Sequence, residues 1–262
     1  MKNINIIKDF VTKGYAVIDC YEFKKLNILK KRIYNLSLKI IGSNNFNSDK
    51  FFDEFHKYIK PKNLNEFKIK LINKINKESF FKDSYFEISR DILELIVGNE
   101  LVMQKNLNLS IQLPKDSNSL LPLHADTWSG NSPFEVVIWI PLVDCINTKS
   151  MFILPSSSYQ KIFTDKNLSK VSNSNQLYNL IKNDLKWIKI NYGQILIFNQ
   201  SLPHGNIMNK EKTTRWSFNC RFKSLFSPYG DKKLGEFFEV QNLKPASKVA
   251  LNYKFPNFKK YV

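Results

Sequence analysis

Three residues of the chain have side chains that commonly bind a transition metal and lie in strand-like surroundings. His124 and Asp126 lie two positions apart in the segment LPLHADTWSG, and His204 follows in LIFNQSLPHGN. In an extended segment, residues two positions apart point to the same side, so the imidazole and the carboxylate would project together. Two imidazoles and one carboxylate on one face of an octahedral ion leave further positions open, unlike a closed structural zinc site. The third histidine, His56, lies in a charged helical context and is expected at the surface.

An arginine downstream of His204 favours the metal site over histidines that are merely hydrogen-bonded at strand ends. Arg215 follows His204 by eleven residues and begins the predicted strand RWSFNCRFK. Polar and apolar residues alternate there, so one face carries Arg215, Ser217, Asn219 and Arg221. A guanidinium is a planar fork that binds a carboxylate through two nitrogens, so this face would suit an anion. An exposed strand with solvated arginines is the alternative.

The spacing of apolar side chains predicts the helices and strands around these residues. Residues 1–20 predict a short helix and, after Gly14, a strand. Between residues 22 and 97, apolar residues recur at intervals of three and four, as at Leu26, Leu29 and Ile33, which is typical of amphipathic helices. From Leu107 the period becomes two. Strands are predicted at residues 107–113, 135–142, 150–154, 187–190, 194–198 and 215–223, with a helix at 176–182.

This order of elements predicts the fold class and the domain organisation. Short strands separated by proline and glycine are typical of a β-sandwich or jelly roll, here preceded by helices. A length of 262 residues suits one domain with a sizeable core. We expect a mostly helical part in residues 1–100, a jelly-roll core in 101–230 and a C-terminal extension in 231–262.

Composition narrows the environment and the partners. The formal net charge is +17, but the lysines are scattered and no nucleic-acid-binding motif accompanies them, so we expect no nucleic-acid partner. The most apolar run, VVIWIPLV, is too short for a membrane span, and we expect no signal peptide and no membrane partner. Three widely spaced cysteines without a CxxC pair favour a reducing compartment, so we expect a cytoplasmic protein. The sequence does not indicate an oligomeric state.

The metal and anion motifs together resemble a known superfamily. The order of His124 and Asp126, then His204, then Arg215 is similar to that of Fe(II)/2-oxoglutarate-dependent dioxygenases, in particular the phytanoyl-CoA dioxygenase-like superfamily. The segments DFVTKGYAVID, VVIWIPLVDC and GQILIFNQSLPHGN also resemble it in order. SMFILPSSS resembles its Gly-x-x-x-x-Pro-Gly-Ser-His segment but lacks the glycines and the histidine. The resemblance implies a mainly β core, a double-stranded β-helix of the cupin-like jelly-roll type, flanked by N-terminal helices.

The resemblance also implies cofactors and the residues that bind them. Fe(II), 2-oxoglutarate and O₂ would be used together, with the metal held by His124, Asp126 and His204. Arg215 would pair with the distal carboxylate of 2-oxoglutarate. Three further residues match positions near the co-substrate in relatives: Gln112, Trp139 and Asn206. A plain core residue is the alternative for Trp139.

The subgroup that the chain most resembles suggests a prime substrate. The segments around the metal motifs are similar to bacterial oxygenases of carbohydrate-biosynthesis clusters, of the streptomycin type. This implies hydroxylation of a sugar, sugar phosphate or nucleotide-sugar in carbohydrate or surface-polysaccharide biosynthesis, so the expected partner is a small anionic sugar derivative. The loop after the ligand pair would line the pocket through Trp128, Ser129 and Asn131, and Arg221 would hold a second anion. A packing role is the alternative for Trp128.

Two other classes of protein fit parts of the pattern. A zinc-type metal hydrolase can use two histidines and an aspartate with a bound water, but it would not need Arg215, and no HExxH motif occurs. A non-catalytic jelly-roll binding protein could carry the same residues around a structural metal or none. Intact ligands together with the arginine favour the oxygenase.

Overall fold

The computed structural model describes residues 2–43, 46–164, 168 and 171–256. Its helices are α1 (Lys2–Lys13), α2 (Phe23–Ile41), α3 (Pro61–Lys77), α4 (Ser79–Ile96), α5 (Ser156–Phe163), α6 (Ser174–Ile181) and α7 (Pro245–Leu251). Single turns of 3₁₀ helix are η1 (Phe55–Lys57), η2 (Asp126–Ser129) and η3 (Asn147–Lys149). Its strands are β1 (Tyr15–Asp19), β2 (Leu101–Gln104), β3 (Asn108–Gln112), β4 (Val136–Pro141), β5 (Phe152–Ile153), β6 (Lys186–Trp187), β7 (Gln194–Asn199), β8 (His204–Gly205), β9 (Arg215–Ser224) and β10 (Phe238–Asn242).

The described strands form two antiparallel sheets. In the larger sheet the order is β1-β7-β4-β9-β2-β10, and β3 also pairs with β9. The long strand β9 has β4 along one edge, while β3 and then β2 follow each other along the other edge. The smaller sheet has the order β6-β5-β8. The predicted fold class, a jelly-roll β core with flanking helices, is confirmed.

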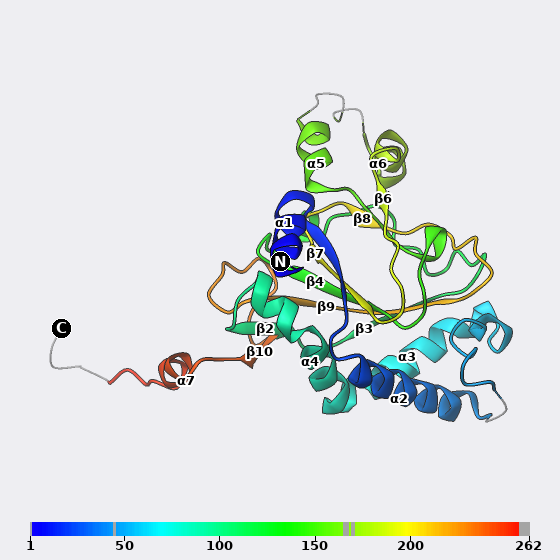
Figure 1. Ribbon diagram of the computed structural model, residues 1–262, viewed down its shortest axis with the longest axis horizontal. Coiled ribbons are helices and arrows are strands. Elements are labelled where there is room, and N and C mark those ends of the chain that lie inside the picture. The colour runs from blue at the N-terminus through cyan, green and yellow to red at the C-terminus, as the bar shows by residue number, and fades with distance from the viewer. Residues whose placement is uncertain (1, 44–45, 165–167, 169–170, 257–262) are drawn as a thin grey trace.

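The alternation along β9 decides which face of the larger sheet the helices cover. Trp216 is fully buried, and its ring meets Phe55 edge-on at 4.8 Å and Phe52 at 5.1 Å between ring centroids. Tyr85 of α4 lies beside Phe222, and its hydroxyl donates a 2.7 Å hydrogen bond to the carbonyl of Ile138 in β4. Figure 1 shows α2, α3 and α4 gathered on this side of the sheet. The polar residues of β9 must therefore face the interior of the β core.

The N-terminal prediction is confirmed by α1, Gly14 and β1. Gly14 has a φ of +80°, and a Cβ there would lie 2.6 Å from Ser156 Oγ and 2.7 Å from Leu202 Cδ1. Both the left-handed backbone and the close approach require glycine at this turn. It allows β1 to run back along β7 as the edge strand of the larger sheet.

The structure differs from the sequence-based prediction in several elements. Five described helices and strands were not predicted: β2, α5, β8, β10 and α7. The strand predicted at residues 187–190 is only Lys186–Trp187, and the one predicted at 150–154 is only Phe152–Ile153. β10 belongs to the predicted C-terminal extension, yet it pairs with β2 and so completes the larger sheet. Residues 257–262 of that extension lie outside the described residues.

His56 corrects a second expectation. It is half-buried in η1 rather than at the surface. Its backbone N–H donates to Thr214 Oγ1 at 3.1 Å, and its Nδ1 lies 3.1 Å from the same oxygen. The prediction was wrong because a contact from the strand region, 158 residues away, covers a residue whose local sequence looks hydrophilic.

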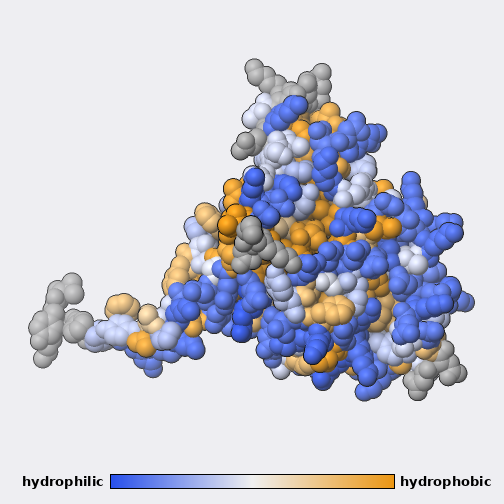
Figure 2. All heavy atoms as spheres, viewed as in Figure 1, coloured by the Kyte–Doolittle hydropathy of each residue, from blue (hydrophilic) through white to orange (hydrophobic). Residues whose placement is uncertain are grey.

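Surface composition agrees with the charge of the chain. Figure 2 shows hydrophilic side chains over most of the face it presents, with hydrophobic ones among them near α1. Exposed apolar residues of α1 are Ile4, Ile7 and Val11. Within the described ranges, no helix is both long and apolar enough to cross a membrane.

Candidate metal centre and its cavity

The backbone brings the three predicted metal ligands together. His124 and His204 exchange two hydrogen bonds: His124 N donates to His204 O at 3.0 Å, and His204 N donates to His124 O at 2.7 Å. The N–H of Asp126 donates to the carbonyl of Gln200 at 3.1 Å. One donor atom from each ligand side chain therefore lies within 4.8 Å of the others. The site depends on this pairing of two segments that are far apart in the sequence.

Two backbone carbonyls set the tautomers of the histidines. Nδ1 of His124 lies 2.8 Å from the carbonyl oxygen of Pro122, and Nδ1 of His204 lies 2.8 Å from that of Leu202. A carbonyl oxygen only accepts, so each Nδ1 carries the proton and each Nε2 keeps its lone pair. This is the arrangement in which imidazoles bind metals, with the second nitrogen held by an acceptor.

Charge in the site also suits a cation. Burial lowers the pKa of His204 to about 4, with a further contribution from His124, so the ring is neutral at neutral pH. Burial alone would raise the pKa of Asp126, but Arg221 and the two imidazoles outweigh it and lower that pKa. The site thus offers the neutral imidazole of His204, a second imidazole from His124 and one carboxylate, which fits the donor set of a divalent transition metal.

We expect the free energy of unfolding of the metal-free protein to fall as the pH drops below about 6.5, the usual histidine pKa. The unfolded chain takes up a proton at that pH, whereas the folded His204 does so only near 4. Between these values the unfolded state binds more protons, so acid destabilises the fold by at most about 1.4 kcal/mol per pH unit for this one group. Urea unfolding of wild type and His204→Gln at about pH 7 and about pH 5 measures this slope. The variant should show the shallower dependence, and equal slopes would contradict the assignment.

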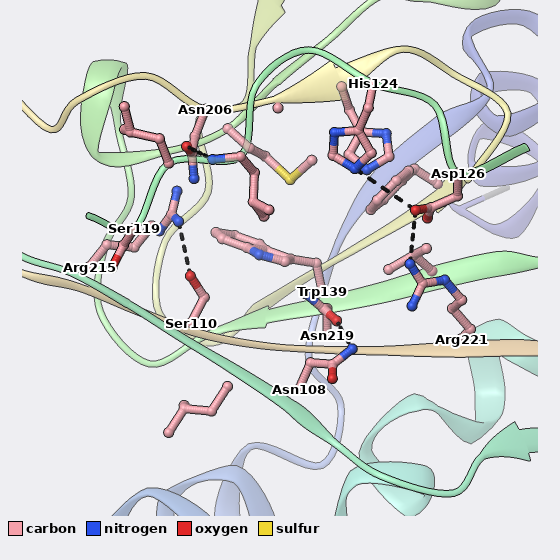
Figure 3. A pocket seen from close by; sticks show the side chains of 18 of the residues that line it. Asn108, Ser110, Ser119, His124, Asp126, Trp139, Asn206, Arg215, Asn219 and Arg221 are labelled. Carbon is pink, nitrogen blue, oxygen red and sulfur yellow. Dashed lines mark hydrogen bonds and ion pairs between the residues drawn. The ribbon is translucent and has the colours of Figure 1, made fainter. Parts of the chain in front are cut away.

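A cavity of about 530 Å³ joins the metal ligands to Arg215. Figure 3 shows His124 and Asp126 at one side of it, Arg215 with Ser110 at the other, and Trp139 between them. Asn108 and Asn219 form part of the lining, and Asn108 Nδ2 donates to Asn219 Oδ1 at 2.9 Å. The polar face of β9 predicted from the sequence is thus the face that lines the cavity, through Arg215, Asn219 and Arg221.

Arg215 is a buried cation without an acidic partner among the described residues. It is 2% exposed, and its guanidinium donates to the carbonyl of Ser150 at 3.1 Å and to Ser110 Oγ at 3.0 Å. Its Nε has no hydrogen-bond partner within the part of the chain that the structure describes. Burial lowers its pKa to about 10, so it stays charged at neutral pH. A buried charge without a counter-ion is costly, and an anionic ligand would remove that cost.

Lys68 is a cavity residue that the sequence analysis missed. It comes from α3 and lines the cavity, where burial and the charge of Arg215 lower its pKa. The signal was present, because Lys68 lies within the buried stripe formed by Leu64, Phe67 and Leu71 of that helix. A lysine at a core-facing helical position is unusual enough to mark a functional candidate.

Comparison with known proteins supports the architecture. No protein-family model matches the chain, and no curated protein matches it in sequence. A non-heme monooxygenase, ThoJ in complex with nickel, is similar over 94% of this chain and 93% of its own, with 14% identity and a TM-score of 0.55. EctD from S. alaskensis, with 2-oxoglutarate and 5-hydroxyectoine, covers 86% and 77% with 15% identity and a TM-score of 0.57.

A third similar structure belongs to an enzyme with a different reaction. SnoN, a non-heme alpha ketoglutarate dependent epimerase from nogalamycin biosynthesis, covers 85% of this chain and 83% of its own, with 11% identity and a TM-score of 0.51. The chain has the fold of these non-heme enzymes. At such low identity the likeness establishes the fold, while function depends on the residues of the site.

Gln112, Trp139 and Asn206 were also predicted to lie near the co-substrate, and the structure places two of these three residues at the cavity. Trp139 and Asn206 line the cavity. Asn206 Oδ1 accepts a hydrogen bond from the N–H of Leu121 at 2.8 Å, and this bond fixes the position of Leu121 at the cavity rim. Gln112 is buried but does not line the cavity; its amide donates to the carbonyl of Ile207 at 2.7 Å. It supports the segment that follows His204 rather than the cavity itself.

The loop after Asp126 lies outside the cavity. Trp128 is 46% exposed beside Phe163 of α5, at 6.0 Å between ring centroids. Ser129 is exposed and Asn131 is buried, and neither lines the cavity. The rim is formed instead by residues 118–121, whose Asn118, Ser119, Leu120 and Leu121 all contribute to the lining. A substrate would meet the loop after Asp126 only if it extended beyond the cavity.

Proposed function

We propose that the chain is an Fe(II)- and 2-oxoglutarate-dependent oxygenase. The observation that supports this best is the pairing, in one cavity, of an open two-histidine, one-carboxylate site with a buried guanidinium that has no acidic partner among the described residues. A single co-substrate that binds a metal at one end and carries a carboxylate at the other would satisfy both. With O₂, bound iron and 2-oxoglutarate would supply the oxidant for a C–H bond of the prime substrate.

Each residue of the cavity has a role in this proposal. His124, Asp126 and His204 would hold the metal, with Nε2 of each imidazole presented by the carbonyl contacts of Nδ1. Arg215 would bind the distal carboxylate of 2-oxoglutarate, helped by the hydroxyl of Ser110. Trp139 is 5% exposed and would keep water away from the space between the two ends.

For the prime substrate we propose a small, hydroxyl-rich, anionic molecule such as a sugar, sugar phosphate or nucleotide-sugar, and hydroxylation as the reaction. The amides of Asn108 and Asn219 and the hydroxyl of Ser119 are available in the cavity for hydroxyl groups. The carbohydrate-cluster subgroup and the cytoplasmic location stay predictions. All three cysteines are buried and free, which agrees with a reducing compartment.

The proposal is tested by anaerobic titration of the protein with Fe(II) and 2-oxoglutarate. Chelation of iron by the keto acid gives a visible charge-transfer band, which should form and saturate with both components present. Absence of the band would contradict the proposal, as would its formation with Zn(II) in place of Fe(II). Succinate release in the presence of individual sugar phosphates and nucleotide-sugars would then identify the substrate. A zinc hydrolase would show no such band and would leave the buried Arg215 without a role.

We expect Lys68→Met to weaken 2-oxoglutarate binding by roughly fivefold, since one partly screened charge contact is worth about 1 kcal/mol. The charge of Arg215 acts on Lys68, so a carboxylate bound at Arg215 also lies in the field of the lysine. The dissociation constant from the charge-transfer titration measures the change. Lys70→Met is the matched control, because Lys70 is on the same helix but exposed and paired with Glu66. Equal affinity in both variants would exclude a role for Lys68 in co-substrate binding.

A further inference from the structure

Arg221 is held by protein groups on all three of its nitrogens. Nη2 lies 2.9 Å from Oδ1 of Asp126, Nε donates to Oε1 of Gln200 at 3.1 Å, and Nη1 donates to Oε1 of Gln104 at 3.2 Å. The side chains of Arg221 and Asp126 are only 16% and 10% exposed. Although the guanidinium of Arg221 lines the cavity, it is directed at the carboxylate of Asp126 (Figure 3). It does not form the free site for a second anion that was expected from the sequence.

Gln200 connects this ion pair to the protein interior. It is fully buried, and its Nε2 donates to the carbonyl of Ser132 at 2.8 Å and to Oε2 of Glu135 at 2.7 Å. With both amide hydrogens used in this way, Oε1 must face Arg221. The backbone carbonyl of the same residue accepts the N–H of Asp126. Gln200 thus fixes both the chain at the metal ligand and the guanidinium that contacts its side chain.

Glu135 closes the network at the far end. It is fully buried, and its Oε1 accepts the N–H of Ser132 at 3.2 Å while Oε2 accepts from Gln200. Both oxygens act as acceptors, so the direction of every hydrogen bond from Glu135 through Gln200 to Arg221 is determined. A continuous chain of buried hydrogen bonds therefore runs from Glu135 to the carboxylate of Asp126.

We infer that Arg221 is a positioning residue that holds the carboxylate of Asp126 in the orientation required for metal binding, and that Gln200 and Glu135 hold Arg221 in place. The inference rests on the proposed metal site. A carboxylate with one oxygen bound to a guanidinium loses rotational freedom before the metal arrives, so less is lost on binding. The positive charge of Arg221 repels a bound cation and so lowers metal affinity. Loss of a residue that orients a metal ligand typically lowers metal affinity about 10- to 100-fold, so we expect the gain from orientation to exceed the cost of this repulsion.

The test is a titration with Co(II), followed by its visible absorption, of wild type, Arg221→Lys, Arg221→Gln and Glu135→Gln. Arg221→Lys keeps the charge but cannot reach three partners at once, and should weaken Co(II) binding about tenfold with an altered spectrum. Arg221→Gln should weaken it at least as much; tighter binding would show that the arginine acts only as a repelling charge and would overturn the inference. Glu135→Gln places a donor against the N–H of Ser132 or the amide of Gln200, and should weaken binding roughly threefold.

The controls separate positioning from folding and from the proposed function. Arg90→Gln removes the same charge from an exposed site on α4 and should leave Co(II) binding unchanged. Thermal unfolding of the metal-free proteins shows whether each variant folds. If the Arg221 variants do not fold, the Co(II) affinity of Glu135→Gln, which keeps the size of the side chain, tests the inference. If the folded variants bind Co(II) with the affinity and the visible spectrum of wild type, the inference is overturned, but the oxygenase proposal is not affected. A wild type that binds no Co(II) would overturn both.

Discussion

Replacing His204 with alanine should severely weaken metal binding and abolish metal-dependent turnover. The variant loses one of three protein ligands, and we expect Co(II) affinity to fall by on the order of 1,000-fold, more than the loss of an outer partner costs. The buried, neutral imidazole with Nε2 free is the ligand that the structure presents most completely. The measurement is the Co(II) titration, followed by the anaerobic test for the charge-transfer band with Fe(II) and 2-oxoglutarate.

The control for this experiment is the remaining histidine of the chain. His56→Ala removes an imidazole that is half-buried near Thr214 and takes no part in the cavity. It should bind Co(II) like wild type. Since His204 packs against Phe198 at 4.9 Å, its loss also removes core contacts, and His124→Ala, at a more exposed ring, provides a second variant. Survival of the charge-transfer band in both His204→Ala and His124→Ala would refute the metal site.

Replacing Arg215 with glutamine should leave metal binding intact and raise the dissociation constant for 2-oxoglutarate by on the order of 100-fold or more. Losing the charged partner of a buried carboxylate costs about 2–5 kcal/mol, because the other charge is left unpaired. Glutamine can still donate to Ser110 or to the carbonyl of Ser150, so the local hydrogen bonding is partly kept. The co-substrate titration of the Fe(II)-loaded variant measures the effect.

A second measurement distinguishes recognition from folding at the same residue. In the ligand-free protein, Arg215 is a buried charge without an acidic partner in the described ranges, so removing it should not lower the midpoint of thermal unfolding, whereas loss of a structural ion pair would lower it. We therefore expect Arg215→Gln to unfold at the wild-type temperature or above. A marked drop in that temperature with unchanged 2-oxoglutarate affinity would assign Arg215 a structural role and contradict the co-substrate site.

The spacing of residues was sufficient to predict those features of the structure that depend only on neighbouring positions in the chain. The alternation of β9 predicted that Arg215 and Arg221 share one face, and both line the cavity. The helical period predicted the buried stripe of α2 that contains Leu26 and Leu29. Short strands such as β8 carry too few residues to show a period of two, and β8 exists because its backbone pairs with β5. Such elements follow from pairing with distant segments, which a single sequence does not display.

Residue type and a spacing of a few positions identify the side chains that can bind a metal or an anion, and the face of its own element on which each lies, because both properties are local. The partners of these side chains depend on how the whole chain folds. Lys68 enters the cavity because α3 packs beside the β core, and residues 118–121 rather than the loop after Asp126 form the rim. Arg221 contacts Asp126 and Gln200 because β9, η2 and the end of β7 meet there. Hydrogen bonds and ion pairs form over about 3 Å in space whatever the separation in sequence, so only the folded chain decides which of several suitable partners each group finds.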